Sequence, residues 1–265
     1  MSDSLDYSLA ELMIVAAARV WRDDGEVLAT GIGTGPRLAA GLARLAYNAG
    51  LMLTDGEAYL VESPVPLGPR EAGYRVQASG LMTYERVFDC VWHGKRHALV
   101  MPTQIDRFGQ ANISWLGDDY ARPKTQLLGA RGFPGNSINH ANSFFVSGHG
   151  KRTFVAGEVD MVCSVGYNPA REIPGMRAFI DLRSVITDLC VMDFGGANHA
   201  VQVRSLHPGV SFDEVQDATG FELRAHPEMQ MTPPPSADDL RIVRALDPHN
   251  LRAGVVRNNP APRRV

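Results

Sequence analysis

The sequence predicts an α/β fold in which helices flank a parallel core sheet and the second half of the chain adds antiparallel strands. Residues 26–47 are typical of a buried strand, a glycine-rich turn and a helix, and residues 51–54 form a second short apolar strand. Two strands joined by a crossover helix indicate a parallel pair with a right-handed connection. Beyond residue 128, short strands separated by turns favour antiparallel pairing.

Length and composition set the domain organisation and exclude several partners. A chain of 265 residues can bury a substantial core, and we expect one domain over residues 1–255 followed by a flexible tail at 256–265. The net charge of -3 provides no basic field, so we expect neither nucleic acid nor a membrane surface as a partner.

The three cysteines are widely spaced and lack a CxxC pair, which argues against a disulfide framework and against a zinc site. We therefore expect reduced cysteines in a cytoplasmic protein. The N-terminal residues have no basic flank before an apolar run, and no apolar stretch approaches the length of a membrane span. Export and membrane insertion are not expected.

The first predicted element is an amphipathic helix that begins at the capping box of Ser8 and Glu11 and ends near Asp23. The strand of residues 27–32 follows, and Pro36 occupies the expected first position of the next helix.

Three glycines, Gly31, Gly33 and Gly35, connect that strand to its helix. Glycines allow the backbone to approach a ligand closely, and the helix N-terminus presents amides and a positive dipole end. We therefore expect Gly33 and Gly35 to contact substrate. The spacing is not the dinucleotide pattern, and a tight turn without a ligand role explains the glycines about equally well.

The remaining elements follow from turn and capping signals. We expect an irregular connection over residues 63–80, a helix over 84–92, a strand over 97–101 and a hairpin over 104–112 with its turn at 106–109. Two further hairpins are predicted at 143–155 and 185–192. Capping residues Ser211 and Ser236 begin the last two helices.

The run from residue 129 to residue 142 combines glycines with amide, hydroxyl and imidazole side chains. An oxyanion pocket needs unhindered backbone N–H groups with side-chain donors beside them. We therefore predict that this loop polarises a carbonyl group. Its candidate residues are Gly129, Ala130, Arg131, Gly132, Asn136, Asn139 and His140. Ser137 is not a predicted nucleophile, because the closing glycine of the nucleophile elbow is absent.

No metal site is predicted. His93 and His97 are four residues apart, but the helix has ended between them and no third ligand is within reach, so we interpret both as surface histidines. The acids Asp55, Glu57 and Glu62 follow the second strand. They are candidates for catalysis or ribose binding, although solvated loop residues are an equally good interpretation.

Five motifs in order resemble the beta subunit of heteromeric CoA-transferases of the glutaconate type. They are G-T-G-P at 33–36, Q-I-D-x-x-G-x-x-N at 104–112, R-P-K-T at 122–125, G-A-R-G-F-P-G-N at 129–136, and H-P-G-V-S-F-D-E-V-x-x-A-T-G-F-E-L at 207–223. The resemblance covers nearly the whole chain. It implies a fold of the NagB/RpiA/CoA-transferase kind, and pairing with a related alpha subunit as a heterodimer or heterotetramer.

The sequence departs from the transferases where the second strand ends. The family implies a nucleophilic glutamate there, but Thr54 occupies the aligned position, and Asp55, one residue later, faces the opposite side of the strand. A threonine hydroxyl cannot replace a carboxylate that must form an anhydride.

This departure makes the chain similar to the beta subunits of actinobacterial cholesterol ring-cleaving hydrolases. The resemblance implies retro-Claisen cleavage of a ring carbon–carbon bond in a CoA thioester, with the base on the alpha subunit, the thioester as substrate and no other cofactor. Thr54, Asp55 and Glu57 would then line the substrate pocket. The alternative is an active CoA-transferase that uses Glu57 or Asp55. A ligand sensor on the same fold and a nicotinamide-binding subunit are more remote alternatives.

Overall fold

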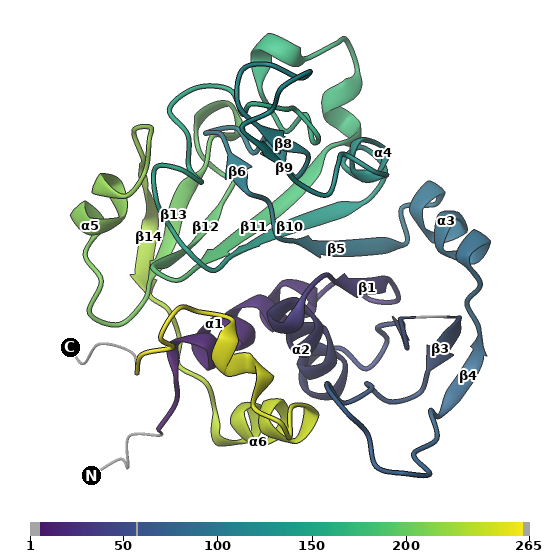
Figure 1. The fold of residues 1–265 in the computed structure, drawn as a ribbon. Coiled ribbons are helices and arrows are strands. Elements are labelled where there is room, and N and C mark those ends of the chain that lie inside the picture. Colours follow the sequence, from purple (N-terminus) through teal and green to yellow (C-terminus); the bar gives the residue numbers. More distant parts are fainter. Residues whose placement is uncertain (1–5, 57, 262–265) are drawn as a thin grey trace. The chain divides into compact units, whose positions relative to one another are not determined.

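A computed structural model describes residues 6–56 and 58–261 (Figure 1). The chain divides into two compact units. The terminal unit holds the described residues up to Val100 and from Pro233 onward, and the central unit holds Met101–Thr232. A single domain over residues 1–255 stays a prediction.

The strands of the terminal unit confirm the predicted parallel pairing at their start. Strand β1 (Leu28–Gly31) runs parallel to β5 (Arg96–Val100), with Leu28 opposite Arg96. Leu28 also forms a parallel bridge with Met52, immediately before β2 (Leu53–Thr54). The other edge of β2 pairs antiparallel with β3 (Tyr59–Val61), which pairs with β4 (Ala78–Leu81). Strand β4 lies at the end of the predicted irregular connection, which is therefore shorter than expected.

Helix α1 (Leu9–Ala18) begins at the predicted capping box and continues as the 3₁₀ turn η1 (Arg19–Trp21). The expected amphipathic character is wrong, because every residue from Ala10 to Ala18 is buried. Apart from Glu11, α1 is apolar on all its faces, as is typical of a helix inside a protein. It packs against α2 (Thr34–Leu42) and α6 (Ala237–Leu246) (Figure 1).

The other helical elements of the terminal unit follow α2 and α6. Helix α2 continues into the π-helical turn η2 (Ala43–Tyr47), and α3 (Tyr84–Trp92) precedes β5. Helix α6 begins at the capping box of Ser236, as predicted, and is followed by the 3₁₀ turn η6 (Leu251–Gly254). No helix in the described ranges is both long enough and apolar enough to cross a membrane.

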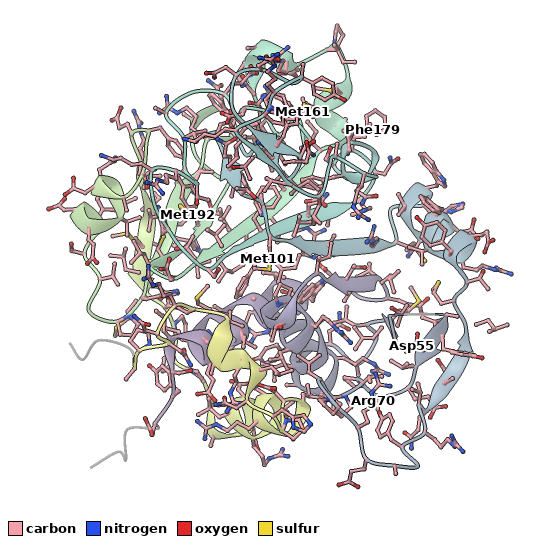
Figure 2. The ribbon with its side chains drawn as sticks, in the orientation of Figure 1. Asp55, Arg70, Met101, Met161, Phe179 and Met192 are labelled. Carbon is pink, nitrogen blue, oxygen red and sulfur yellow. The ribbon has the colours of Figure 1, made fainter. Side chains whose placement is uncertain are left out.

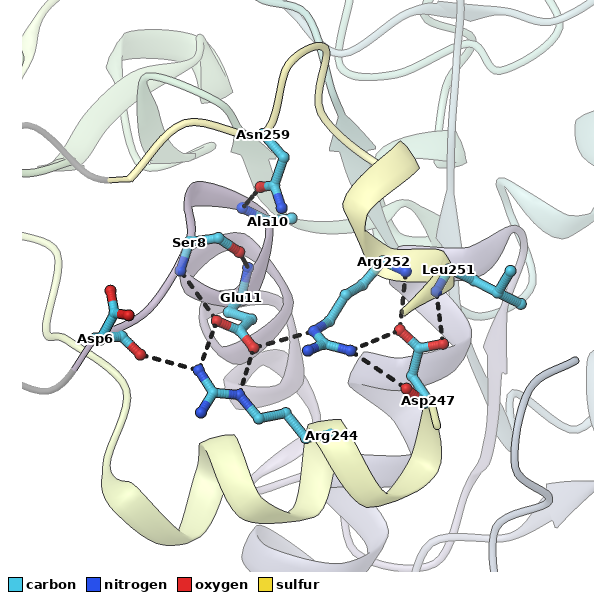
Figure 3. A network of polar contacts seen from close by, with 9 residues as sticks. All are labelled: Asp6, Ser8, Ala10, Glu11, Arg244, Asp247, Leu251, Arg252 and Asn259. Atoms are coloured by element: carbon cyan, nitrogen blue, oxygen red, sulfur yellow. Dashed lines mark hydrogen bonds and ion pairs between the residues drawn. The ribbon is translucent and has the colours of Figure 1, made fainter. Parts of the chain in front are cut away.

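A network of charged groups joins the two ends of the terminal unit (Figure 3). The buried carboxylate of Glu11 accepts hydrogen bonds from Arg244 at 2.8 Å and from Arg252 at 3.0 Å, and it also accepts from the amide of Ser8. Burial opposes the charged form of Glu11, but these hydrogen bonds outweigh burial and lower its pKa. Arg252 also pairs with the carboxylate of Asp247 at 3.0 Å.

The described part of the predicted tail is held against α1. Val256 is buried, the Asn259 side chain accepts a hydrogen bond from the amide of Ala10 at 3.0 Å, and the carbonyl of Pro260 accepts from the amide of Leu9 at 2.9 Å. These bonds satisfy amides of the first turn of α1, which have no partner within the helix. The last four residues of the predicted tail, 262–265, lie outside the described residues.

The central unit contains a five-stranded sheet in the order β10-β11-β12-β13-β14. The outer pairs β10–β11 and β13–β14 are parallel, and the two inner pairings are antiparallel. The hairpin predicted at 185–192 is confirmed by β11 and β12. The strands are β10 (Ala141–Val146), β11 (Asp181–Thr187), β12 (Cys190–Asp193), β13 (Gln202–Leu206) and β14 (Ala225–Met231).

The hairpin predicted at 143–155 is wrong. Strand β10 pairs parallel with β11, and residues 152–155 form only a bridge between Phe154 and Ile105. Both segments contain residues that favour strands, and such residues do not identify their own partner strand.

Two small hairpins and several short helices complete the central unit. The predicted hairpin at 104–112 is confirmed by β6 (Gln104–Ile105) and β7 (Ala111–Asn112), and a second hairpin joins β8 (Trp115–Leu116) to β9 (Thr125–Gln126). Ser211 caps α5 as predicted. The helical elements are α4 (Phe133–Asn136), η3 (Pro169–Arg171), η4 (Met176–Phe179), η5 (Ala197–His199) and α5 (Phe212–Asp217).

Two histidines, the half-buried His149 and the buried His207, lie beside Thr187 in the central unit. His207 Nε2 donates to the carbonyl of Thr187 at 2.8 Å, and His149 Nδ1 lies 3.1 Å from the hydroxyl of Thr187. The ring of His149 also stacks on Phe154, with 4.0 Å between ring centroids. Burial lowers the pKa of each histidine to about 4, so the folded chain holds both rings neutral near pH 7.

We expect Glu11→Gln to lower the free energy of unfolding by about 3 kcal/mol, because it leaves two arginines without their buried counter-charge while preserving the capping box. Urea denaturation measures the change. Asp238→Asn is the matched control, because that carboxylate is 82% exposed and pairs with Arg241 on the surface. The control should change stability by less than about 0.5 kcal/mol. Equal effects of the two substitutions would contradict a stabilising role for the Glu11 network.

We expect the stability of the chain to fall as the pH decreases from about 6.5 towards about 4. The unfolded chain takes up protons on His149 and His207 near pH 6.5, whereas the folded chain resists protonation until about pH 4. The stability that the neutral rings contribute is therefore complete above pH 6.5. Urea midpoints measured between pH 7.5 and pH 4.5 test this expectation. His207→Gln should flatten the dependence, and substitution of the exposed His93 by Gln should leave it unchanged.

Candidate functional site

The glycine turn after β1 is built by a close approach of strand and helix. A Cβ atom placed on Gly31 would lie 2.2 Å from the carbonyl oxygen of Pro36, so only glycine fits where β1 meets the first turn of α2. Gly33 caps α2 with φ of 98°, a conformation that favours glycine. Gly35 is buried inside the helix, and Pro36 is its third residue rather than its first.

The second half of the predicted pocket lies at the end of β2. The hydroxyl oxygen of Thr54 accepts a hydrogen bond from the amide of Gly56 at 3.3 Å. The carboxylate of Asp55 accepts from the amides of Ala58 and Tyr59, both at 3.1 Å, and so closes the turn from β2 to β3 (Figure 2). Glu57 lies outside the described residues.

The terminal unit contains a cavity of about 230 Å³ between β1, β2 and α2. Thr54 and Gly56 line it, but Asp55, Gly33 and Gly35 do not. Its wall combines polar and apolar surface, and Arg37 brings a charged side chain to it. The lining residues are Ala29, Thr30, Gly31, Arg37, Leu38, Ala40, Gly41, Leu53, Thr54, Gly56, Pro64, Val65, Leu67 and Leu246.

Sequence reasoning missed an arginine in this region. Arg96 is the first residue of β5, and its Nε donates to the hydroxyl oxygen of Thr30 on β1 at 3.0 Å. Burial lowers the pKa of Arg96 from its usual value. The predicted strand begins at His97, one residue too late, and so leaves Arg96 in the preceding turn. The pairing with Leu28 places Arg96 in β5, and the local sequence does not show this pairing.

The loop predicted to form an oxyanion pocket lies in the central unit. Its N-terminal part folds with positive φ at Gly129 (85°) and at Arg131 (51°). The amides of residues 129–132 donate to no acceptor within the described parts of the chain, and Arg131 and Gly132 are exposed. These unhindered amides have the character that the prediction required. Whether they bind substrate stays a prediction.

The side chains of the same loop form bonds within the loop. Asn139 donates to the carbonyl of Gly135 at 2.6 Å, and Ser137 donates to that of Pro134 at 2.8 Å. Asn142 donates to the carbonyls of Asn136 and His140. The ring of Phe133 is buried against Phe144 and holds the loop on β10. These bonds give the asparagines a structural role in shaping the loop.

His140 is buried, and its Nδ1 lies 2.8 Å from the carbonyl oxygen of Ala141. That carbonyl can only accept, so Nδ1 carries a proton and donates to it.

The interpretation of His93 and His97 as surface residues is correct for His93 and wrong for His97. Helix α3 ends before His93, which is exposed, as predicted. His97 is fully buried in β5, where its Nδ1 lies 2.6 Å from the carboxylate of Asp24 and its ring packs on Trp21. Across residues 6–56 and 58–261, no group of three His, Cys, Asp or Glu residues is arranged to hold a metal ion.

Asp106, within the second of the five motifs, shapes the hairpin of β6 and β7. Its carboxylate accepts from the amides of Phe108 and Gln110, both at 2.8 Å. Burial raises its pKa to about 6 despite these bonds. The motif is therefore explained by the turn and needs no ligand.

Comparison with known proteins identifies the family. No family model matches the chain. The cholesterol ring-cleaving hydrolase IpdB subunit of Mycobacterium tuberculosis is 40% identical over 94% of this chain and 98% of that protein. The crystal structure of Rhodococcus jostii IpdAB superposes with a TM-score of 0.87 and 37% identity, over 95% of this chain and 99% of that one.

A transferase is a more distant relative. The corresponding polypeptide of the 3-oxoadipate CoA-transferase of Pseudomonas knackmussii is 31% identical over 91% of this chain and 94% of that protein. Together these matches confirm the predicted CoA-transferase-like fold and establish the chain as an enzyme subunit. Because its identity with the IpdB subunits extends over almost its full length, the chain belongs to the family of cholesterol ring-cleaving hydrolase IpdB subunits, within the wider group of CoA-transferase beta subunits.

Proposed function

We propose that this chain is the beta subunit of a heteromeric hydrolase that cleaves a ring carbon–carbon bond in a steroid-derived CoA thioester. The observation that carries the proposal is the 40% identity with IpdB subunits named cholesterol ring-cleaving hydrolases, over 94% of the chain. The CoA thioester is the substrate in this proposal, and no further cofactor takes part.

The end of β2 supports a hydrolase rather than a transferase. Thr54 occupies the position where the transferase resemblance implies a nucleophilic glutamate. Its hydroxyl bonds to the amide of Gly56, and no basic side chain in the described residues forms a hydrogen bond with it. A hydroxyl without a neighbouring base is a weak nucleophile and cannot form the anhydride that a carboxylate forms. Water is therefore the nucleophile in the proposed reaction.

The proposed reaction is a retro-Claisen cleavage. A base removes a proton from water, and the new carbon–oxygen bond forms at the ring ketone. The ring carbon–carbon bond then breaks, its electrons move to the carbon beside the thioester, and that carbon takes up a proton. The product is an open-chain acyl-CoA with a new carboxylate. The base belongs to the alpha subunit, and the unpaired amides of residues 129–132 are the proposed donors to the ketone oxygen.

The proposed assembly is a heteromer with a related alpha subunit, as a heterodimer or heterotetramer. Its support is the Rhodococcus jostii structure, whose name joins IpdA and IpdB. The cytoplasmic location remains part of the proposal, and the three free cysteines agree with a reducing compartment.

A CoA-transferase is the second candidate function, favoured by the 31% identity with the 3-oxoadipate CoA-transferase relative. It requires Asp55 or Glu57 as the nucleophile. The carboxylate of Asp55 already accepts two backbone hydrogen bonds in the turn after β2, which argues against its use as the attacking group.

We expect the co-purified complex of the two subunits to consume a cyclic keto-enoyl CoA thioester and to form a product heavier by one water. Mass spectrometry of the reaction measures this mass change. The same complex should transfer no label from radioactive succinate or acetate into CoA thioesters. Label transfer, together with a borohydride-sensitive glutamyl-CoA on this chain, would favour the transferase instead.

We expect Asp55→Asn to retain hydrolase activity within about threefold, because the amide oxygen of asparagine can still accept from Ala58 and Tyr59. If the Asp55 carboxylate were the nucleophile, the same substitution would abolish turnover, because an amide oxygen cannot form the anhydride. Steady-state kinetics of the assembled complex distinguishes the two outcomes. Asp118→Asn, which alters an exposed acid of the central unit, is the control for activity that is lost during purification and assembly of the complex.

A further inference from the structure

Three polar side chains lie in register on neighbouring strands of the terminal unit. Leu28 of β1 is opposite Arg96 of β5 on one side and opposite Met52 on the other. Side chains alternate along a strand, so Arg96, the Thr30 that follows Leu28 by two residues, and the Thr54 that follows Met52 by two residues share one face. Neighbouring strands lie about 5 Å apart, which brings the two threonines next to each other.

This face is the one turned away from α2. The Cβ direction of Gly31 points at Pro36 in the first turn of α2. Thr30 precedes Gly31 and therefore points to the opposite face. The row of Arg96, Thr30 and Thr54, which we call the β-face row, is thus a different feature from the contact between β1 and α2.

Arg96 carries a charge for which the described chain provides no counter-ion. Its side chain is half-buried, and its Nε donates to the hydroxyl oxygen of Thr30. No aspartate or glutamate among the described residues forms an ion pair with it. A guanidinium has five N–H donors, and buried or half-buried charges in proteins are normally paired.

Both hydroxyl groups of the β-face row are available as hydrogen-bond donors. The oxygen of Thr30 accepts from Arg96 at 3.0 Å, and the oxygen of Thr54 accepts from the amide of Gly56 at 3.3 Å. Neither hydroxyl donates to an acceptor in the part of the chain that the structure describes. Each therefore keeps its own hydrogen for an acceptor that the described chain does not supply.

We infer that the β-face row binds a carboxylate, and that this is a free carboxylate on the acyl portion of the CoA thioester. The remaining donors of Arg96 and the hydroxyls of Thr30 and Thr54 supply a planar fork and two neutral donors, which match a singly charged carboxylate. The 3′-phosphate of CoA, a doubly charged monoester near pH 7, carries more charge than one guanidinium balances. The inference rests on the proposed function for the identity of the substrate, and it adds which residues of this chain hold the carboxylate of its acyl group.

The kinetic test compares two substrates of the assembled complex, the ring thioester with a free side-chain carboxylate and its methyl ester. Arg96→Gln should raise KM for the free acid by about tenfold to a hundredfold, the range of a charge-assisted hydrogen bond. It should leave KM for the ester unchanged. Thr30→Val should act in the same direction but less strongly. The controls are substitution of the exposed Arg86 by Gln and of the exposed Thr125 by Val, which should change neither value.

A binding test separates failure of the inference from failure of the proposed function. Adipate should bind to the wild-type complex in isothermal titration calorimetry, adipamide should not, and Arg96→Gln should weaken adipate binding at least tenfold. These measurements need no turnover, so they test the β-face row even if the complex hydrolyses nothing. Adipate affinity that is unchanged in Arg96→Gln overturns the inference even if hydrolysis is active. Loss of CoA affinity without loss of adipate affinity would assign the row to a phosphate and also overturn it.

Discussion

The terminal unit depends on the close approach between the end of β1 and the first turn of α2. At Gly31 the strand and helix backbones are so near that no side chain fits between them. This contact fixes which face of β1 is covered by helix and which face carries Thr30. It therefore determines where the polar groups of β1, β2 and β5 stand, before any ligand is considered. The glycine turn acts through geometry, although its sequence also resembles an anion-binding loop.

The candidate functional groups lie on two kinds of backbone, the ends of short strands and an irregular loop. At the ends of the short strands β1, β2 and β5, regular pairing sets the direction of Thr30, Thr54 and Arg96. In the loop after β9, positive φ values at Gly129 and Arg131 expose successive amides instead. Strand positions hold side chains accurately, because each is constrained by its neighbours. Loop amides can approach a ligand closely, because no side chain stands in front of them. Side chains held on strands therefore suit the recognition of an acid, and exposed loop amides suit the polarisation of a carbonyl.

Local signals in the sequence predict much of the fold. The capping residues Ser8, Ser211 and Ser236 begin helices where expected, and the hairpin at Gln104–Asn112 forms because Asp106 caps its turn. Pairing between distant segments is harder to predict. The segment around Phe154 is as apolar as a strand but bridges to Ile105, a choice that only the assembled core decides. The burial of α1 on all sides could not be predicted either, because the sequence of a helix does not show how many neighbouring elements will cover it.

The sequence predicts where a site could lie, but it does not predict the contacts that the candidate side chains form. Glycine density predicts open amides at residues 129–132, and these amides donate to no acceptor in the described residues, but their binding to a substrate stays a prediction. Asn139 and Asn142 of that loop donate to nearby carbonyls instead of standing ready for a ligand, because short polar side chains readily bond to their own backbone. Arg96 escapes prediction for a different reason. Its importance comes from the register with Leu28 and from the absence of an acid paired with it among the described residues, and neither is a property of local sequence.

The Glu11 network affects the order in which the chain folds during its synthesis on the ribosome. The carboxylate of Glu11 can bond to Arg244 and Arg252 only after these residues, 233 and 241 positions later in the chain, have been synthesised. The central unit is continuous in sequence and is synthesised completely before those arginines are added. It can therefore fold first, while α1, already exposed and apolar, has not yet received α6. During that interval the nascent chain presents a hydrophobic helix, which makes it a natural client for a chaperone that binds such segments.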